Sequence, residues 1–381
     1  MKAFLILEDG TTFEGTSIGS TKEVISEIVF NTSMTGYLEV LTDPSYAGQA
    51  VVMTYPLIGN YGICHEDMES LKPWPDGYIV RELSRIPSNF RSEDTIQHFL
   101  ETHDIPGISG IDTRALTKIL REKGTMNGMI TTDETYVLSE VMDRMRSYSV
   151  TGVVKATSCK EAYVLPPADP AASIRSIHTS ENPIGIQKRL GQGKRVALLD
   201  LGAKNNIAHS LAERGCEVTI YPSATSAKAI LATHPDGIML SNGPGDPKEN
   251  VEVIAEIRKL YESQVPIFAI CLGHQLMALA TGADTYKLKY GHRGGNHPVK
   301  DLETGRVYIS SQNHGYAVDV DSLDPKVAIP AFTNVNDGTN EGLKYINKNI
   351  FTVQYHPEAC PGPQDSGYLF DRFLNMMEVQ A

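Results

Sequence analysis

The chain has 381 residues, more than an ordinary single domain holds, so we expect two domains. Its apolar fraction of 41% and charged fraction of 21% are typical of a globular protein, and each half is long enough to bury a core. The net charge of -12 argues against binding to nucleic acid or to an anionic membrane, and no apolar run approaches the roughly 18 residues of a membrane span.

In the first part of the chain, turn residues separate short apolar runs, a pattern that predicts strands. The expected strands are Ala3–Leu7, Thr11–Glu14, Glu23–Phe30 and Val51–Thr54. One helix stands out in TRALTKILREKG, with Asp112 as its N-cap and Gly124 as its stop. We therefore expect a strand-rich α+β domain over residues 1–155.

A change of composition follows this domain. Four prolines fall between Tyr163 and Gly193 among Ala, Ser and Asn residues, and LGQGK closes the stretch. Proline and glycine at this density predict a linker or irregular connection, which we place at residues 156–193.

From residue 194 onward, buried-strand and helix patterns alternate at short spacing. The runs RVALLDLG, EVTIYP, DGIML and VPIFAI predict strands, and NNIAHSLAERG, SAKAILATH and VEVIAEIRKLYES predict helices between them. This alternation predicts an α/β domain over residues 194–381, with a mostly parallel sheet flanked by helices. Ligands bind at the carboxyl ends of such strands, where the loops SNGPGDP and ICLGHQ both fall.

The cysteine in the second of these loops, Cys271, stands at a strand-to-helix switch. The surrounding A-I-C-L-G is similar to a nucleophile elbow, G-x-S-x-G, with Cys in place of Ser and Ala269 in place of the first Gly. A helix N-terminus there is expected to favour the thiolate, and the Leu272 amide to point at an oxyanion. Taken alone, the stretch is equally compatible with a buried, inert cysteine.

The remaining cysteines do not form a pattern. All five are scattered, and no two form a C-x-x-C pair: Cys64, Cys159, Cys216, Cys271 and Cys360. This argues against a disulfide framework or a zinc site, and the opening MKAFLILEDG has too short an apolar run for a signal peptide. We therefore expect a protein of the reducing cytoplasm with no metal.

A second candidate constellation is VQYHPE near the end of the chain. His356 and Glu358 are two residues apart, so both side chains point the same way from an extended strand. Glu358 can then orient the imidazole toward a nucleophile, although a surface His-Glu pair gives the same pattern. The other histidines considered as bases are expected to be structural or substrate-lining: His274, His292, His297 and His314.

The loop SNGPGDP is the third candidate. Its two glycines and two prolines make it rigid, and Gly243 can present its amide where a side chain would block the approach. An ordinary tight turn explains the same residues.

Together, SNGPGDP, AICLGHQ and YHPE resemble the motifs of class I glutamine amidotransferases. LGAKNNI, GHRGGNHPVK, SQNHGYAVD and HPEACPGPQDS resemble the small, glutamine-hydrolysing subunits of carbamoyl-phosphate synthetases, and LEDGTTFEG, FNTSMTGYLEVLTDPSYAGQ and IDTRALTKILREKG resemble the N-terminal domain of those subunits. Nearly the whole chain is covered. The clearest departure is Ala269, where the family usually has Gly.

The resemblance implies that Cys271 is the nucleophile, His356 the base and Glu358 its orienter. It implies oxyanion donors at the amides of Gly243 and Leu272. The residues that it implies for binding L-glutamine are Ser45, Gly243, Gly245, Leu272, Gln275, Asn313, Gly315 and Tyr316, where the family often has Phe at the last position.

The resemblance also implies a partner. A separate large subunit would make carbamoyl phosphate from ammonia, bicarbonate and ATP with Mg, for arginine or pyrimidine synthesis, in a heterodimer. This chain has no G-x-x-x-x-G-K-[ST] nucleotide loop, and LGQGKR fails that spacing, so we expect no cofactor in it. The alternatives are a different amidotransferase partner, a free-standing cysteine hydrolase of γ-glutamyl compounds, and a non-catalytic scaffolding subunit.

Overall fold

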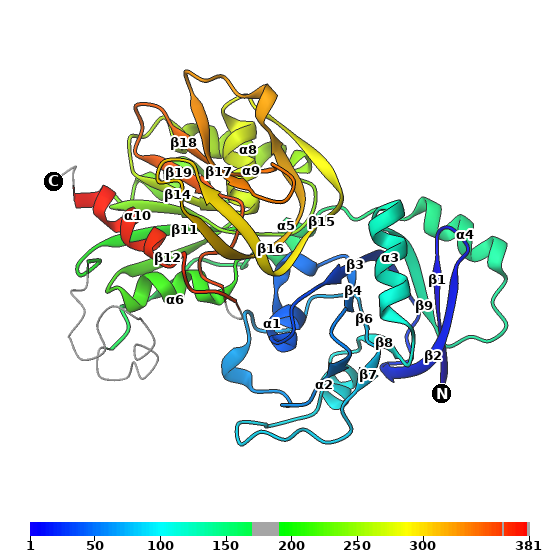
Figure 1. The fold of residues 1–381 in the computed structure, drawn as a ribbon. Coiled ribbons are helices and arrows are strands. Elements are labelled where there is room, and N and C mark those ends of the chain that lie inside the picture. Colours follow the sequence, from blue (N-terminus) through cyan, green and yellow to red (C-terminus); the bar gives the residue numbers. More distant parts are fainter. Residues whose placement is uncertain (170–189, 360–361, 379–381) are drawn as a thin grey trace.

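A computed structural model describes residues 1–169, 190–359 and 362–378 of the chain. It has two parts, an N-terminal barrel drawn in blue and cyan and a C-terminal sheet with helices drawn in green to red (Figure 1). Among the described residues, no helix is both long and apolar enough to cross a membrane.

The N-terminal part is built on a closed barrel of strands in the order β1-β2-β8-β6-β4-β3-β9. These strands are β1 Lys2–Leu7, β2 Thr12–Gly19, β3 Val24–Asn31, β4 Gln49–Met53, β6 Gly77–Ile79, β8 Pro106–Ser109 and β9 Met126–Thr131. The four expected strands are present, and β1 and β2 form the expected antiparallel pair. Closure of the sheet leaves no edge strand exposed in the barrel.

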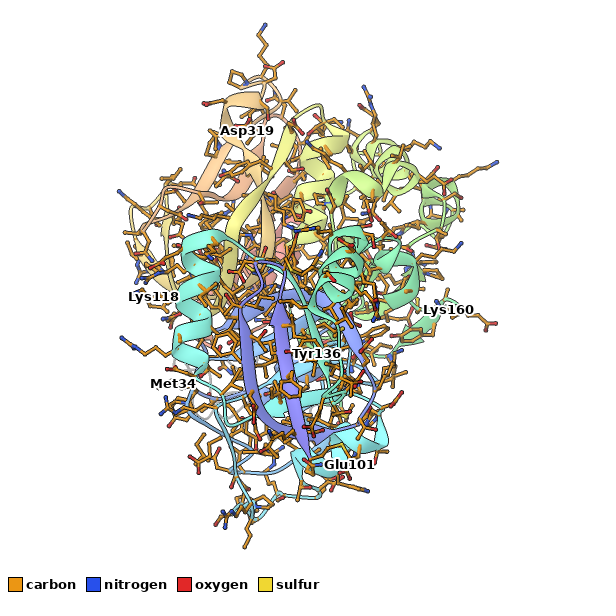
Figure 2. The ribbon with its side chains drawn as sticks, turned by 90° about the vertical axis from the view of Figure 1, so that its right-hand side faces the viewer. Met34, Glu101, Lys118, Tyr136, Lys160 and Asp319 are labelled. Carbon is orange, nitrogen blue, oxygen red and sulfur yellow. The ribbon has the colours of Figure 1, made fainter. Side chains whose placement is uncertain are left out.

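Helices and a short strand pair surround this barrel. They are α1 Tyr37–Thr42, α2 Ile96–Thr102, α3 Thr113–Lys123, α4 Leu138–Ser147 and the parallel pair β5 Leu57–Ile58 and β7 Glu82–Leu83. The expected helix is α3, which begins at the Asp112 cap and ends at Gly124. Figure 2 looks onto the barrel, with Lys118 on the outward side of α3 and Tyr136, whose ring meets Phe4 edge-on, in front of the strands.

The C-terminal part is a ten-stranded sheet in the order β10-β12-β11-β13-β14-β19-β18-β17-β15-β16. The strands are β10 Tyr163–Leu165, β11 Arg195–Asp200, β12 Glu217–Pro222, β13 Gly237–Leu240, β14 Ile267–Ile270, β15 Asp284–Asp301, β16 Val307–Asp319, β17 Ala328–Asn334, β18 Asn340–Tyr345 and β19 Ile350–Val353. The strands β12, β11, β13, β14 and β19 run parallel, and antiparallel strands extend the sheet on both sides.

Helices cover both faces of this sheet, as the alternating pattern predicts. The helices are α5 Val153–Thr157, α6 Asn205–Glu213, α7 Ala227–Leu231, α8 Val251–Tyr261, α9 Leu272–Ala280 and α10 Tyr368–Glu378. α7, α8 and α9 pack into one apolar core with the side chains of Ala197 and Leu199, while α6 and α10 pack into a second core with those of Val196 and Leu198. Alternate residues of β11 therefore face opposite layers.

The segment expected to be an irregular connection is more ordered than predicted. β10 lies within it and pairs antiparallel with β12, so residues 163–165 belong to the C-terminal sheet. The proline-rich composition concealed this short strand, whose order comes from pairing with a distant segment. Residues 170–189 of the expected connection lie outside the described residues.

The two parts meet where the long β15–β16 hairpin lies against the barrel (Figure 1). The Thr125 amide donates to the Lys289 carbonyl at 2.9 Å, and the Thr32 amide donates to the Arg293 carbonyl at 3.2 Å. The Lys287 ammonium pairs with the Glu27 carboxylate at 2.6 Å. These contacts bring the barrel to the carboxyl-end loops of the parallel strands.

Candidate active site

Cys271 occupies a sharp turn between β14 and α9. Its backbone has φ 52° and ψ -105°, a conformation that is strained for a residue with a side chain. The Cys271 amide donates to the Val353 carbonyl at 2.8 Å, which ties the turn to β19. This is the geometry of a nucleophile elbow, in which strain is retained because the surrounding strands hold the turn in place.

Glycine is required at one side of this elbow and not at the other. A Cβ on Gly273 would lie 2.6 Å from the Leu240 carbonyl oxygen, so α9 packs directly on the backbone of β13. Ala269, in contrast, is fully buried in the apolar core between β13 and β19, where its methyl group has room. The departure from glycine at Ala269 therefore leaves the turn intact.

The expectation that the Cys271 thiol favours its thiolate is wrong for the resting site. Burial, Asp43 and Glu358 raise its pKa, and they outweigh the lowering contributions of Lys204 and of the Leu272 amide. The neutral thiol lies 3.7 Å from the Asn313 carbonyl oxygen, to which it donates. A nucleophile at this position therefore needs a base to remove its proton.

His356 and Glu358 form a buried pair. The imidazole Nδ1 lies 2.6 Å from the carboxylate Oε1, and the two side chains are 1% and 0% exposed, which excludes a surface pair. The His356 Nε2 atom is buried and has no hydrogen-bond partner among the described residues. Glu358 thus fixes one imidazole nitrogen and leaves the other for a substrate or nucleophile.

The strand β16 brings this pair to the cysteine. The His356 amide donates to the Ser311 carbonyl at 2.9 Å, and the Cys271 thiol meets the carbonyl of Asn313, two residues further along the same strand. Because the carbonyl groups of residues two apart on a strand point toward the same edge of that strand, the two contacts place His356 and Cys271 along the same edge of β16.

Lys204 is a further member of this group; it lies in the segment LGAKNNI but was not singled out as a site residue. Its ammonium lies 2.8 Å from Glu358 Oε1, and its side chain is 7% exposed. Burial opposes ionisation of Lys204, but Glu358, Glu69 and Asp43 raise its pKa above the usual value. Burial alone would raise the pKa of Glu358, yet Lys204 and His356 lower it to about 2, so the carboxylate stays ionised.

A pocket of about 410 Å³ opens onto Cys271 at the junction of the two parts. Its walls include seven of the eight residues expected to bind glutamine: Ser45, Gly243, Gly245, Gln275, Asn313, Gly315 and Tyr316. The eighth, Leu272, is buried and is not among the residues that line the pocket. The structure therefore brings these residues together from both domains.

The N-terminal part contributes directly to this pocket. Ser45 follows α1 and accepts a hydrogen bond from the Asn242 side chain at 2.9 Å. Asp43 accepts from the Ser45 amide at 2.9 Å and from the Asn313 side chain at 2.8 Å. Asp43 lies in the quoted segment FNTSMTGYLEVLTDPSYAGQ and Asn242 in SNGPGDP, but neither was singled out as a site residue.

Gly243 lies against the elbow, and only a glycine fits there. A Cβ would collide with the Leu201 carbonyl oxygen and lie 2.8 Å from a methyl carbon of Leu272. Its amide donates no hydrogen bond to the described residues, so it is free to meet an oxyanion next to the Leu272 amide.

Gln275 and Tyr316 hold the pocket wall together. The Gln275 amide group donates to the Tyr316 carbonyl at 2.8 Å and to Gln354 at 2.9 Å. Burial and the nearby Asp246 carboxylate raise the pKa of the Tyr316 hydroxyl, so the side chain of Tyr316 lies close to the SNGPGDP loop.

The other histidines have structural partners. His274 is buried and bonds to Thr352 at 2.7 Å. His292, His314 and Glu341 form a buried group whose ligand-type atoms lie within 4.8 Å of one another. The His314 nitrogens already meet the Tyr316 carbonyl at 2.7 Å and Gln312 at 3.0 Å, so this group forms a hydrogen-bonded network that reaches the pocket wall at His314.

Comparison with known proteins agrees with this geometry. Residues 197–376 match the family model for class I glutamine amidotransferases, and residues 5–130 match that for the CPSase domain of the carbamoyl-phosphate synthase small chain. The elbow, the sheet and the first of these matches define a class I glutamine amidotransferase.

Relatives at high identity define the family more narrowly. The chain is 50% identical over 379 residues to the carbamoyl phosphate synthase small chain of Oceanobacillus iheyensis, covering 99% of this chain and 96% of the relative. It is 49% identical over 376 residues to the small chain of Listeria monocytogenes, covering 99% and 97%. A solved glutamine amidotransferase structure from Thermotoga maritima covers 49% of this chain and 83% of its own, with 18% identity and a TM-score of 0.37. The chain belongs to the family of carbamoyl phosphate synthase small chains.

Proposed function

We propose that this chain hydrolyses L-glutamine to glutamate and ammonia through a thioester on Cys271. The observation that carries the proposal is the buried His356–Glu358 pair, which contacts the same strand, β16, as the elbow residue Cys271. Cys271 in turn lines a pocket of about 410 Å³. Such a pair can take the proton that the raised pKa of Cys271 keeps on the sulfur.

The reaction proceeds in two halves. The Cys271 sulfur attacks the side-chain amide carbon of glutamine while His356 takes the thiol proton, and the amides of Gly243 and Leu272 stabilise the oxyanion. His356 then gives the proton to the departing nitrogen, so ammonia leaves and a γ-glutamyl thioester remains. In the second half His356 activates water, which attacks the thioester carbon, and glutamate leaves as the thiol re-forms.

The ammonia passes to a large subunit in the proposed assembly. That partner uses ATP, Mg and bicarbonate to make carbamoyl phosphate for arginine or pyrimidine biosynthesis, in a cytoplasmic heterodimer, while this chain holds no cofactor. The support is the match of the N-terminal part, residues 5–130, to the small-chain CPSase domain and the names of the relatives.

The test is a pair of assays on the full chain. Glutamine hydrolysis is expected to disappear in Cys271→Ser, and acid quenching of the wild-type protein is expected to trap a glutamine-derived thioester. Co-purification with a large subunit is expected to give glutamine-dependent carbamoyl phosphate synthesis. Full hydrolysis by Cys271→Ser would reject the nucleophile, and vigorous hydrolysis unaffected by any large subunit would favour a free-standing hydrolase.

A further inference from the structure

Arg293 is a buried cation in the wall of the pocket that holds Cys271. It lies on β15, and its side chain is 4% exposed. Among the described residues, the guanidinium makes one hydrogen bond, from Nη1 to the Tyr290 carbonyl at 2.7 Å, and forms no ion pair. Its Nε atom is buried without a hydrogen-bond partner. Most of the donors of this guanidinium are therefore unused.

The carboxylate of Glu27 interacts electrostatically with Arg293, but its hydrogen bonds go to other residues. Glu27 accepts hydrogen bonds from Lys287 at 2.6 Å and from Gln49 at 2.7 Å. Burial lowers the pKa of Arg293, and Glu27 only partly opposes this effect. Because a buried charge without a partner is costly, a guanidinium in this state is suited to receive an anion.

Two glycines, Gly291 and Gly315, leave space beside the buried guanidinium on the pocket side. Its Nη2 lies 3.3 Å from the point that a Cβ on Gly315 would occupy, and its Cζ lies 3.2 Å from that point on Gly291. A side chain at either position would crowd the guanidinium. Both glycines and Cys271 line the same pocket, so Nη2 lies beside the space that a substrate bound at Cys271 would fill.

We propose that Arg293 binds the α-carboxylate of the glutamine substrate and sets the specificity of the site for free α-amino acids. This inference rests on the proposed hydrolysis of glutamine. A guanidinium matches a carboxylate with parallel N–H donors, which a protein-bound glutamine residue, lacking a free α-carboxylate, cannot use. Lys287, a second cation of the pocket, is paired with Glu27 and about half exposed, so it is less suited to this role.

The test compares two substrates in two proteins. 4-Aminobutanamide is glutamine without its α-carboxylate. In Arg293→Met, we expect kcat/KM for glutamine to fall by roughly 10- to 100-fold while that for 4-aminobutanamide changes by less than about threefold, because only glutamine loses a charged hydrogen bond. Arg293→Lys should recover part of the preference, and the matched control Lys287→Met should keep the wild-type ratio.

A binding measurement makes the result independent of turnover. By calorimetry, wild-type protein should bind L-glutamate more tightly than 4-aminobutanoate, and Arg293→Met should lose that difference. Equal losses for both substrates, or an unchanged preference, would overturn the assignment. If the wild type fails to hydrolyse glutamine but keeps the Arg293-dependent binding preference, the proposed function fails while the carboxylate site stands.

Discussion

The carboxylate of Asp43 accepts a hydrogen bond from the side-chain amide of Asn313 at 2.8 Å, and this bond joins the N-terminal barrel to the β16 wall of the pocket. Asn313 also presents its carbonyl to the Cys271 thiol. Asp43 of the barrel domain thus holds Asn313, which contacts the proposed nucleophile, although Asp43 and Asn313 are 270 positions apart in the chain.

The first prediction concerns this bond. Asp43→Ala should raise KM for glutamine by about tenfold, because the buried Asn313 amide loses its acceptor and its strand loses a fixed position. Steady-state glutaminase kinetics measure the effect. The control is Asp76→Ala, whose carboxylate instead accepts from Ser26 at 2.9 Å within the barrel. A comparable rise in KM for the control would assign the effect to general loosening of the domain.

Removing the charge of Lys204 should shift the pH dependence of the protein. Lys204 and His356 hold the pKa of Glu358 at about 2, below its unfolded value of about 4.3. The stabilising contribution of Glu358 is therefore present above pH ~4.3 and is lost as pH falls toward the folded pKa. In Lys204→Met the folded pKa rises, so activity and stability should both fail at higher pH than in the wild type.

Lys204→Met should also unfold more easily at neutral pH. The loss expected is about 3–5 kcal/mol, because a buried ion pair is broken and Glu358 is left without its cation. Urea titrations at several pH values measure both effects. The control Lys248→Met breaks the exposed pair with Asp284 and should cost no more than about 1 kcal/mol. If the variant lost stability at the same acidic pH as the wild type, the result would contradict the role of Lys204.

The structure of the elbow predicts that kcat is sensitive to substitution at Gly273 and insensitive to substitution at Ala269. Gly273→Ala should lower kcat by at least about 100-fold, because its methyl would displace α9 from the Leu240 backbone and move Cys271. Ala269→Gly should keep kcat within about twofold and lower the free energy of unfolding by about 1 kcal/mol, since a buried methyl is lost from the core. Rate assays and chemical denaturation distinguish the two, and an active Gly273→Ala protein would show that the packing is looser than the structure indicates.

Glu69 is predicted to position the His356–Glu358 pair through α6. Its carbonyl accepts from the Asn205 amide at 2.7 Å, and its carboxyl accepts from the Asn206 amide at 3.3 Å. The helix has no side-chain cap of its own at Lys204, and the Asn206 side chain donates to the Glu358 carbonyl. Glu69 thus supplies from the barrel domain the cap that the helix lacks.

Replacing Glu69 should therefore loosen the segment that contains Glu358. Glu69→Ala should speed amide exchange in residues 205–207 and 354–359 and lower kcat about tenfold with little change in KM. Glu69→Gln should restore most of kcat, since burial raises the pKa of Glu69 to about 8 and the neutral carboxyl resembles an amide. Exposed Glu66→Ala serves as the control, and unchanged exchange at 354–359 would contradict the link.

Local sequence patterns predict many of the elements and the candidate reacting groups. The spacing of apolar residues located β1–β4, α3, β11–β14 and the helices α6–α8, because burial on one face or both imposes a periodicity of 2 or 3.6. It did not locate the remaining barrel strands or the β15–β16 hairpin, whose order comes from pairing with distant segments. The motifs around Cys271, His356 and Glu358 could also be predicted, because they depend on residues close together in the chain. An elbow requires small residues around its nucleophile, and a base two positions from its orienter needs only an extended strand.

The ionisation and the hydrogen-bond partners of those groups depend instead on how the chain folds. The raised pKa of Cys271, the buried charge of Lys204 and the guanidinium of Arg293, which has no ion pair within the described part of the chain, all depend on burial and on residues far away in the chain. The contribution of Asp43 and Glu69 depends on how the barrel meets the second domain. Ionisation and hydrogen bonding of buried groups are set by neighbours in space, and a sequence pattern reports neighbours along the chain.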